Sequence, residues 1–359
     1  MAEGSGRPVV AVVGVGLIGG SIGLAADAEV RGWDPGDGVL ELARERGAVT
    51  TACESLADAV EGADIVFVAV PVGALPSVLA EVLTTAGGDC VVTDVGSTKR
   101  AVVAAVDDPR FVGGHPLAGA ETAGVEHARA DLFDGATWYL TPTARTGGML
   151  YERLYRFLVE LGARPATLDA ETHDALLASV SHLPHVLANV LVARAARVLS
   201  EEGERLPATG PSFRDATRVA GANTAIWRDI YLANADALVD AIDDTVRRLG
   251  EVREALTTRD GAAVAAWNDG AREERRKLLE ADLAGGEVHE LRVAVPNRPG
   301  VVAEVALALG RAGVNILDMA LYPASDMSSG TIALWLAGDG RADEAQALVE
   351  GLGLTVARA

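Results

Sequence analysis

Short apolar runs alternate with amphipathic helical stretches in the first part of the chain. The runs PVVAVVG, EVRGWD, ADIVFVAV, DCVVTDVG, RFVGG and ATWYLTP read as buried strands. Strands that are buried on both faces appear as near-continuous apolar runs, and strands that alternate with helices form parallel, doubly wound sheets. The pattern therefore predicts an α/β domain with a sheet of this kind over residues 1–168.

Helical periodicity replaces the strand pattern over residues 169–284, which are rich in Ala, Leu, Val and Arg. The segment Ala170–Glu202 is long for one globular helix, and Pro184 inside it predicts a kink or a break, because proline lacks the N–H that a helix needs. Apolar residues lie on several faces of this segment. We therefore expect an all-α domain that is buried between subunits or domains, and a dimer is favoured.

Strand alternation returns in the last part of the chain, residues 288–359. HELRVAVP, VNILDMALYP, GTIALWLAG and LTVA read as strands, with helices expected over residues 300–312 and over RADEAQALVEG. This β-α-β-β-α-β order describes a ferredoxin-like α+β unit. The segment LAGGEV before it has the composition of a linker.

Composition narrows the classes of partner. The chain of 359 residues carries a formal net charge of -20, which would repel nucleic acid and anionic membrane surfaces, so neither is expected as a partner. Cys53 and Cys90 are too few for a disulfide framework, which favours a reducing compartment. We find no apolar run of the roughly 20 residues that span a bilayer, and Met1 to Pro8 lack the features of a signal peptide. A cytoplasmic protein is expected.

A glycine fingerprint follows the first predicted strand. GVGLIGGS has the G-x-G-x-x-G spacing, which allows a tight turn and lets backbone N–H groups approach a pyrophosphate. Asp34 ends the next strand, where a carboxylate binds the ribose of NAD and repels the extra phosphate of NADP. A role for Asp34 in capping the turn before Pro35 stays open. The sequence predicts a Rossmann-type NAD site formed by Gly14, Gly16, Leu17, Ile18, Gly19 and Asp34.

Polar residues follow two of the later strands. TDVGSTKR places Ser97 and Lys99 at the carboxyl end of a buried strand, the edge where open α/β sheets bind ligands. A simple helix cap before KRAVVAAV is the alternative. FVGGHPLAGAE places His115 and Glu121 in a Gly/Pro-rich loop, which is an unusual setting for a core histidine.

Two helical segments carry further polar residues. SVSHLPHVLANV sets His182 and His185 at a spacing that suits a metal, but no Cys, His or carboxylate cluster completes a site, so no metal is expected. FRDATRVAGANTAIWRDI is dense in Arg, Asp and Trp, and taken alone these pairs could be solvated ion pairs of little energy.

Taken together, GVGLIGGS, DVGSTK, HPLAGAE, SHLPH and FRDATR occur in an order that resembles the TyrA family of prephenate and arogenate dehydrogenases, from about Val9 to Leu283. The segment LRVAVPNRPGVVAEVALALGRAGVNILDM is similar to an ACT domain, a regulatory module. The resemblance implies a homodimer joined through the helical domain. It also implies NAD-dependent oxidative decarboxylation of prephenate in tyrosine biosynthesis, with arogenate as the alternative substrate.

The resemblance also implies roles for individual residues. His115 matches the base that takes the proton of the substrate's C4 hydroxyl, and Ser97 matches the serine that bonds this hydroxyl and the imidazole. Arg218 matches an arginine that grips a carboxylate, and Glu121 and Asp215 match acidic residues of an ionic gate. The residues expected at the substrate are His185, Arg218, Lys99, Glu121, Asp215 and Trp227. His182 is expected in helix packing, with a direct role at the substrate as the alternative. His127, His173 and His289 are expected at the surface.

The ACT-like unit is expected to bind an aromatic amino acid, most simply tyrosine, and a dimerisation module without a ligand is the alternative. The residues expected at this regulatory site are Asn297, Pro299, Gly300, Asn315 and Asp318. Two other classes of protein are alternatives. A non-catalytic NAD-binding sensor would lack the base or the carboxylate grip. A β-hydroxyacid dehydrogenase would use a lysine of the helical domain, where Lys277 is the only one.

Overall fold

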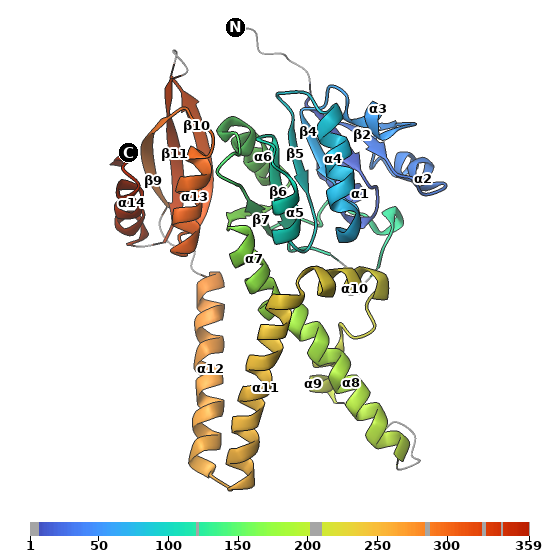
Figure 1. Ribbon diagram of the computed structural model, residues 1–359, viewed down its shortest axis with the longest axis vertical. Helices are drawn as coiled ribbons and strands as arrows, with labels where there is room; N and C mark the ends of the chain where they lie inside the picture. Colours follow the sequence, from blue (N-terminus) through green and yellow to red (C-terminus); the bar gives the residue numbers. More distant parts are fainter. Residues whose placement is uncertain are drawn as a thin grey trace.

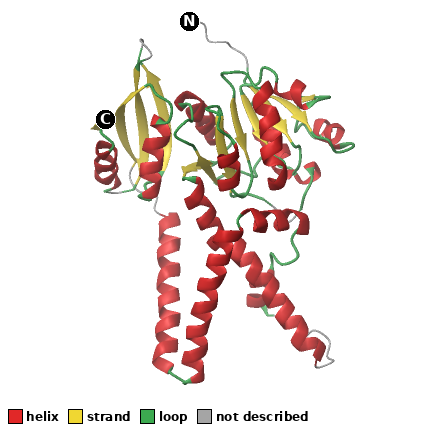
Figure 2. Ribbon diagram, viewed as in Figure 1, coloured by secondary structure: helices red, strands yellow, loops and turns green. Residues whose placement is uncertain are grey.

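The computed structural model describes residues 7–119, 122–201, 210–283, 288–324, 328–338 and 340–358. Two sheets stand side by side, and long helices extend away from them on one side (Figure 1). Colouring by secondary structure separates the helical middle of the chain from the two sheet-containing parts (Figure 2). The order predicted from the periodicity, an α/β part, then an all-α part and then a second sheet, is the order observed.

The larger sheet has eight strands in the order β3-β2-β1-β4-β5-β6-β7-β8. Its strands are β1 (Val9–Val13), β2 (Glu29–Trp33), β3 (Thr51–Ala52), β4 (Ile65–Val68), β5 (Val91–Asp94), β6 (Phe111–Pro116), β7 (Thr137–Thr141) and β8 (Arg164–Thr167). The chain leaves β1 on one side toward β2 and later returns on the other side at β4, so the switch point of the sheet lies at β1. Ligands of open α/β sheets bind at the carboxyl ends of the strands at such a point.

One prediction for this sheet is wrong in part, because the sheet is not wholly parallel. β7 pairs with β6 in the antiparallel sense, and β8 then pairs with β7 in parallel. Among the described residues of the connection from β6 to β7, the one helical element is the 3-10 turn Val125–His127, whereas the crossover between parallel strands usually runs through an α-helix. The short strand β3 and the Pro-containing edge strand β8 carry too little alternation to be recognised in the sequence.

Apolar side chains of β1 alternate between two cores. Val10 and Val12 belong to one buried cluster, while Ala11 and Val13 belong to a second cluster. A strand with both faces covered is what the continuous apolar run predicts. The elements that surround the sheet are α1 (Leu17–Ala25), α2 (Val39–Glu45), α3 (Leu56–Val60), η1 (Val72–Ala74), α4 (Leu75–Thr85), α5 (Arg100–Ala105), η2 (Val125–His127) and α6 (Gly148–Glu160).

The predicted break near Pro184 takes the form of a π-helical turn. α7 (Ala170–Leu177) leads into η3 (Ala178–His182), and α8 (Leu183–Glu201) continues from it. Proline removes one helical hydrogen bond and crowds the preceding turn, which a wider turn relieves. The remaining helices of this part are α9 (Pro211–Thr217), α10 (Thr224–Ala233), α11 (Ala235–Thr257) and α12 (Gly261–Leu283).

The helical stretch Ala170–Arg197 is long and apolar enough to cross a membrane by length and composition, with a mean hydropathy of 1.6 in a window that is 22% buried. The expectation that no apolar run reaches this length is therefore wrong. Its first half carries the fully buried side chains of His173 and Asp174, so one face of that half packs against protein, while Val180 on another face is 58% exposed. In its second half, Val190 is 57% exposed in the single chain.

The smaller sheet is antiparallel, in the order β10-β11-β9-β12. Its elements are β9 (Val288–Pro296), α13 (Val301–Arg311), β10 (Ile316–Pro323), β11 (Ser329–Ala337), α14 (Arg341–Gly351) and β12 (Thr355–Arg358). This unit packs against α6 and β8, and its buried residues continue the apolar core of the larger domain. Gly300, with φ of +82°, lies so close to the larger domain that a Cβ would stand 2.3 Å from the Ala144 carbonyl oxygen.

Candidate active site

The glycine-rich turn after β1 is built for close backbone approach. Gly14 has φ of +94°, and a Cβ there would stand 2.5 Å from the Ala69 carbonyl oxygen. A Cβ on Gly19 would stand 2.0 Å from the Gly14 carbonyl oxygen. A Cβ on Gly16 would meet no protein atom within 4 Å, so open space lies beside this residue. The turn thus leaves a free cradle at the start of α1, which fits a dinucleotide pyrophosphate.

Asp34 lies beside this turn, just past the end of β2. Its carboxylate accepts hydrogen bonds from the backbone N–H of Val15 and from that of Gly36, both at 2.8 Å. The bond to Gly36 is the turn-capping contact that the sequence left open, and the bond to Val15 ties the carboxylate to the glycine-rich turn. Both interpretations of Asp34 are therefore compatible with its position.

A cavity of about 710 Å³ opens between the carboxyl ends of β5 and β6 and the helices η3, α8 and α10. Five residues that the sequence singled out share its lining: Ser97, His115, His185, Arg218 and Trp227. Segments far apart in the chain thus contribute to one cavity. We call this cavity the cleft.

His115 lies in β6 and not in a loop, which corrects the sequence-based expectation. It pairs with Tyr139 of β7 and is 7% exposed, with its ring at the cleft. Burial, followed by the charges of His173, Lys99 and His182, holds the pKa of His115 well below its usual range. The imidazole is therefore neutral at neutral pH and available to accept a proton.

His173 was expected at the surface, and this prediction is wrong. Its side chain is fully buried, and its Nε2 lies 2.9 Å from His115 Nδ1. Its Nδ1 lies 2.8 Å from Oδ1 of Asp174, which is also fully buried. The sequence reasoning missed both residues. The available signal was helical spacing, because His173 and Asp174 precede Leu177 by the distances that place side chains on one helix face.

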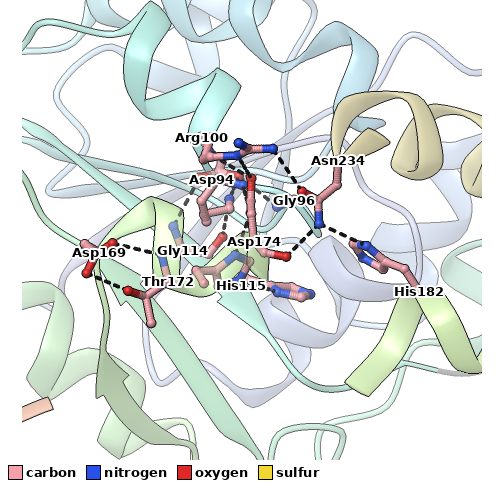
Figure 3. Close-up of polar contacts among 12 residues, drawn as sticks. Asp94, Gly96, Arg100, Gly114, His115, Asp169, Thr172, Asp174, His182 and Asn234 are labelled. Atoms are coloured by element: carbon pink, nitrogen blue, oxygen red, sulfur yellow. Dashed lines mark hydrogen bonds and ion pairs between the residues drawn. The ribbon is translucent and has the colours of Figure 1, made fainter. Parts of the chain in front are cut away.

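Lys99 does not face the cleft, contrary to its expected contact with substrate. Its side chain is fully buried, forms an ion pair with Asp94 and donates a hydrogen bond to the Gly114 carbonyl oxygen at 2.7 Å. Burial lowers the pKa of the Lys99 amine more than the Asp94 charge raises it. Asp94 also accepts from the backbone N–H groups of Gly96 and Gly114 (Figure 3). The pair therefore braces the segments that carry Ser97 and His115.

The opposite wall of the cleft is formed by the helical part of the chain. His185 stacks on Trp227 with ring centroids 3.4 Å apart. Burial, followed by the charge of Arg218, lowers the pKa of His185. Arg218 is exposed at the cleft, while Asp215 is exposed on α9 and is not part of the lining. Glu121, the other residue of the expected gate, lies outside the described residues.

Asn234, at the start of α11, is a third residue that the sequence reasoning missed. Its amide nitrogen donates to the Asp174 carbonyl oxygen at 2.7 Å and lies 3.2 Å from His182 Nδ1, while its oxygen accepts from Arg100 at 3.3 Å (Figure 3). Burial lowers the pKa of His182 to about 4. His182 lines the cleft, so it does more than fill space between helices.

The residues expected at the regulatory site lie at two places, the turn before α13 and the start of β10. Asn297 and Pro299 are exposed in the turn before α13, while Asn315 is exposed before β10. Of Asp318 only the place in β10 is described. A cavity between this turn and α6 measures about 20 Å³, which holds one water and no amino acid.

Two other expectations concern histidine and metal. His127 is exposed, and His289 is partly buried. Within the described ranges, no group of three or more His, Cys, Asp or Glu side chains has an arrangement that could hold a metal ion.

Comparison with known proteins places these features in a family. Residues 24–167 match the family described as "Prephenate dehydrogenase, nucleotide-binding domain", and residues 169–267 match "Prephenate dehydrogenase, dimerization domain". The chain is 31% identical over 359 residues to "Prephenate dehydrogenase" of Bacillus subtilis, covering 96% of each chain. It is 35% identical over 264 residues to "Cyclohexadienyl dehydrogenase" of Zymomonas mobilis, covering 70% of this chain and 89% of that one.

Solved structures agree with this assignment. Prephenate dehydrogenase from Aquifex aeolicus, in complex with hydroxyphenyl propionate and NAD+, superposes with a TM-score of 0.71 at 27% identity, covering 77% of this chain and 100% of that chain. The arogenate dehydrogenase of Synechocystis gives a TM-score of 0.66 at 25% identity and covers 75% of this chain and 99% of that chain.

Proposed function

The chain belongs to the prephenate dehydrogenase family, and we propose that it oxidises and decarboxylates prephenate to 4-hydroxyphenylpyruvate with NAD+, a step of tyrosine biosynthesis. One observation carries the proposal. A neutral, buried imidazole, His115, opens onto the same cleft as an arginine, Arg218, and the cleft lies at the edge of the sheet where the glycine-rich turn offers a dinucleotide cradle.

The reaction requires two things of the protein's own residues, orientation of the substrate and transfer of one proton. NAD+, when bound, accepts the hydride that leaves C4 of the ring. The C4 hydroxyl gives up its proton as the hydride leaves, so that C4 becomes a carbonyl carbon. The bond to the ring carboxylate then breaks with release of CO2, and its electron pair completes the aromatic ring as a phenolate, which takes a proton back to give the phenol of 4-hydroxyphenylpyruvate. Aromatisation drives the step, so the chain has to orient the substrate and remove one proton. A well-placed general base contributes roughly 100- to 10,000-fold.

His115 is the proposed base, and the residues around it have complementary roles. Ser97 lies at the same cleft and is placed to bond the C4 hydroxyl. Arg218 offers a planar guanidinium to a substrate carboxylate, which it can grip at two points. His185 and Trp227, stacked on each other, form an aromatic wall beside the ring.

Arogenate is the second candidate substrate. It differs from prephenate in carrying an amine in place of the side-chain keto group, so the residues named above serve either compound. The names of two similar proteins, a cyclohexadienyl dehydrogenase and an arogenate dehydrogenase, keep this candidate in view. Prephenate is preferred because the relative that aligns with 96% of this chain is named for it.

We propose that the middle of α8 forms part of the subunit interface of a homodimer. Val190, Leu191 and Val192 are 57%, 43% and 39% exposed in the single chain, and residues 169–267 match a dimerization domain. A second copy of the chain would cover these apolar side chains, so no membrane is needed to account for the apolar character of α8. We accordingly propose a cytoplasmic location.

The smaller sheet with α13 and α14 is proposed to be an ACT domain of ferredoxin-like topology that binds tyrosine. The strand order β10-β11-β9-β12 and the element order support this assignment. Because the cavity beside Asn297 holds about 20 Å³, binding of an amino acid there requires the turn before α13 to move away from α6.

Two other classes of protein are less well supported by the geometry. A sensor without turnover has no need of Ser97, His115 and Arg218 at one cleft. Lys277, the lysine that a β-hydroxyacid dehydrogenase would require in the helical part, is exposed on α12 and paired with Glu274.

The proposal is tested by following NADH absorbance with purified protein and either prephenate or arogenate, each with NAD+ and with NADP+. We expect turnover with prephenate and NAD+, and a lower rate once tyrosine is added. Faster turnover with arogenate would reverse the preference between substrates. Absence of turnover with both substrates and both cofactors would refute the enzymatic function.

A further inference from the structure

We propose that a buried hydrogen-bond network centred on Asp174 assigns opposite tautomers to the two imidazoles at the head of the cleft. In this arrangement His115 presents a bare Nε2, and His182 presents an Nε2–H. His173, Asp174 and Asn234 are then positioning residues for the reaction. The catalytic consequence rests on the proposed function, whereas the proton positions follow from the network itself.

The assignment starts at Asp174, whose surroundings leave it no role except that of an acceptor. Its Oδ1 accepts from the backbone N–H of Lys99 at 2.7 Å, and its Oδ2 accepts from the backbone N–H of Arg100 at 3.0 Å. Burial by itself raises the pKa of this carboxyl, but the hydrogen bonds from His173 and from these backbone groups outweigh burial and lower it. An ionised carboxylate only accepts, so His173 Nδ1 carries a proton.

The next step passes from His173 to His115. Burial lowers the pKa of His173 more than its bond to Asp174 raises it, with further contributions from the charges of Lys99 and Asp94. A neutral imidazole with a proton on Nδ1 has a lone pair on Nε2. That lone pair faces His115 Nδ1 at 2.9 Å, so His115 Nδ1 is the donor. The proton of neutral His115 is thereby placed on Nδ1, and its Nε2 is left bare to act as the base.

The second branch of the network fixes His182. The amide of Asn234 has two partners that settle its orientation, since its oxygen faces the Arg100 guanidinium and its nitrogen faces the Asp174 carbonyl oxygen. The nitrogen therefore donates to His182 Nδ1 at 3.2 Å. A neutral His182 then carries its proton on Nε2, which is buried, lacks a hydrogen-bond partner within the described protein, and belongs to a side chain that lines the cleft.

Two rings of the same type thus differ in what they offer, His115 an acceptor and His182 a buried donor without a partner in the described protein. The acceptor suits a hydroxyl that must lose its proton. The donor suits a carbonyl, carboxylate or carboxamide oxygen of a bound ligand, because such an oxygen would satisfy the unpartnered N–H. Reversal of either tautomer would set lone pair against lone pair or proton against proton, so the network selects the ligand's orientation as well as the base.

A pair of variants at residue 173 tests the positioning role. His173→Phe removes the acceptor and retains a flat ring, and we expect kcat to fall by roughly 100-fold or more with KM changed little. His173→Gln restores an acceptor oxygen within reach of His115 Nδ1, and it should recover a large part of kcat. His127→Phe, at an exposed site outside the cleft, is the matched control and should retain wild-type kcat. Equal activity of the Phe and Gln variants, or a loss shared by the control, would overturn the role.

Direct observation of the ring nitrogens separates this proposal from the proposed function. The chain has six histidines, so ¹⁵N-labelled histidine gives a spectrum that single variants can assign. We expect His115 and His173 protonated on Nδ1 and His182 protonated on Nε2, each in the neutral form. Nε2 protonation of His115 would refute the network whatever the activity. The expected tautomers in a protein that oxidises neither substrate would support the network and refute the enzymatic function.

Discussion

The two sides of the cleft are encoded in different ways. On the cofactor side, the residues that shape the glycine-rich turn are near neighbours in the sequence. A Cβ on Gly14 or Gly19 would collide with backbone, while the open space beside Gly16 is left for a ligand. On the substrate side, His115 and His173 are separated by 58 positions, and Lys99 and Asp174 by 75. A local motif can be recognised from the spacing of its residues in the sequence. A network of residues that are far apart in the chain has no fixed spacing by which it could be recognised.

The sharpest test of this comparison is His115→Asn. Loss of the base should reduce kcat by roughly 100- to 10,000-fold with a modest change in KM, because the side chain acts on the proton and does not hold the substrate. Steady-state kinetics with saturating NAD+ measures both constants. A large rise in KM with kcat preserved would assign His115 to binding.

Arg218→Gln should have a smaller effect, of a different kind. Removal of a charge-assisted bond to a carboxylate, worth about 1.5–3 kcal/mol, should raise KM by roughly 10- to 100-fold and leave kcat closer to the wild-type value. The same assay measures it, and Arg214→Gln, on the exposed face of α9, is the matched control. An unchanged KM would remove Arg218 from the substrate site.

On the cofactor side, Gly19→Ala and Gly16→Ala separate folding from binding. The Cβ at position 19 would collide with backbone, so this variant should lose about 1–3 kcal/mol of stability along with NAD+ affinity. The Cβ at position 16 meets no protein atom, so this variant should keep its melting temperature and lose only affinity. Thermal unfolding and NAD+ titration measure the two effects. If Gly16→Ala binds NAD+ normally, the cradle lies elsewhere.

The last prediction concerns stability, which should depend on pH. The folded-state pKa values of His115, His173 and His182 are all lowered, in the case of His182 to about 4. Below about pH 6.5 the unfolded chain therefore binds more protons than the folded chain, and the free energy of unfolding decreases as pH falls. Each such group contributes a slope of about 1.4 kcal/mol per pH unit between its two pKa values.

The slope is measured by urea unfolding at several pH values between about 7.5 and about 5, a range that brackets the pKa of free histidine, about 6.5. His173→Phe should flatten it, because one titrating group is lost, while His127→Phe should leave it unchanged. A stability that is constant or that rises over this range would contradict neutral burial of these rings.

Several features of the fold could be predicted because their signals are local. The buried runs predicted β1, β2 and the strands from β4 to β7, the return of alternation predicted the second sheet, and Pro184 predicted the interruption that appears as η3. These features depend on side-chain periodicity and on the missing N–H of proline, which act over a few residues. β3 and β8 escaped because they are too short, or too proline-rich, to show alternation.

The sequence by itself thus determined the order of the domains, the glycine-rich turn and the identity of the polar residues available to the cleft. Only the tertiary structure decided that β7 runs against β6, that His115 is held within a strand, that Lys99 turns inward to Asp94, and that His173 is buried beside His115. The physical reason is that strand direction and the pairing of buried polar groups depend on partners brought together by folding, because a buried donor or acceptor must be satisfied by whatever group lies next to it in space.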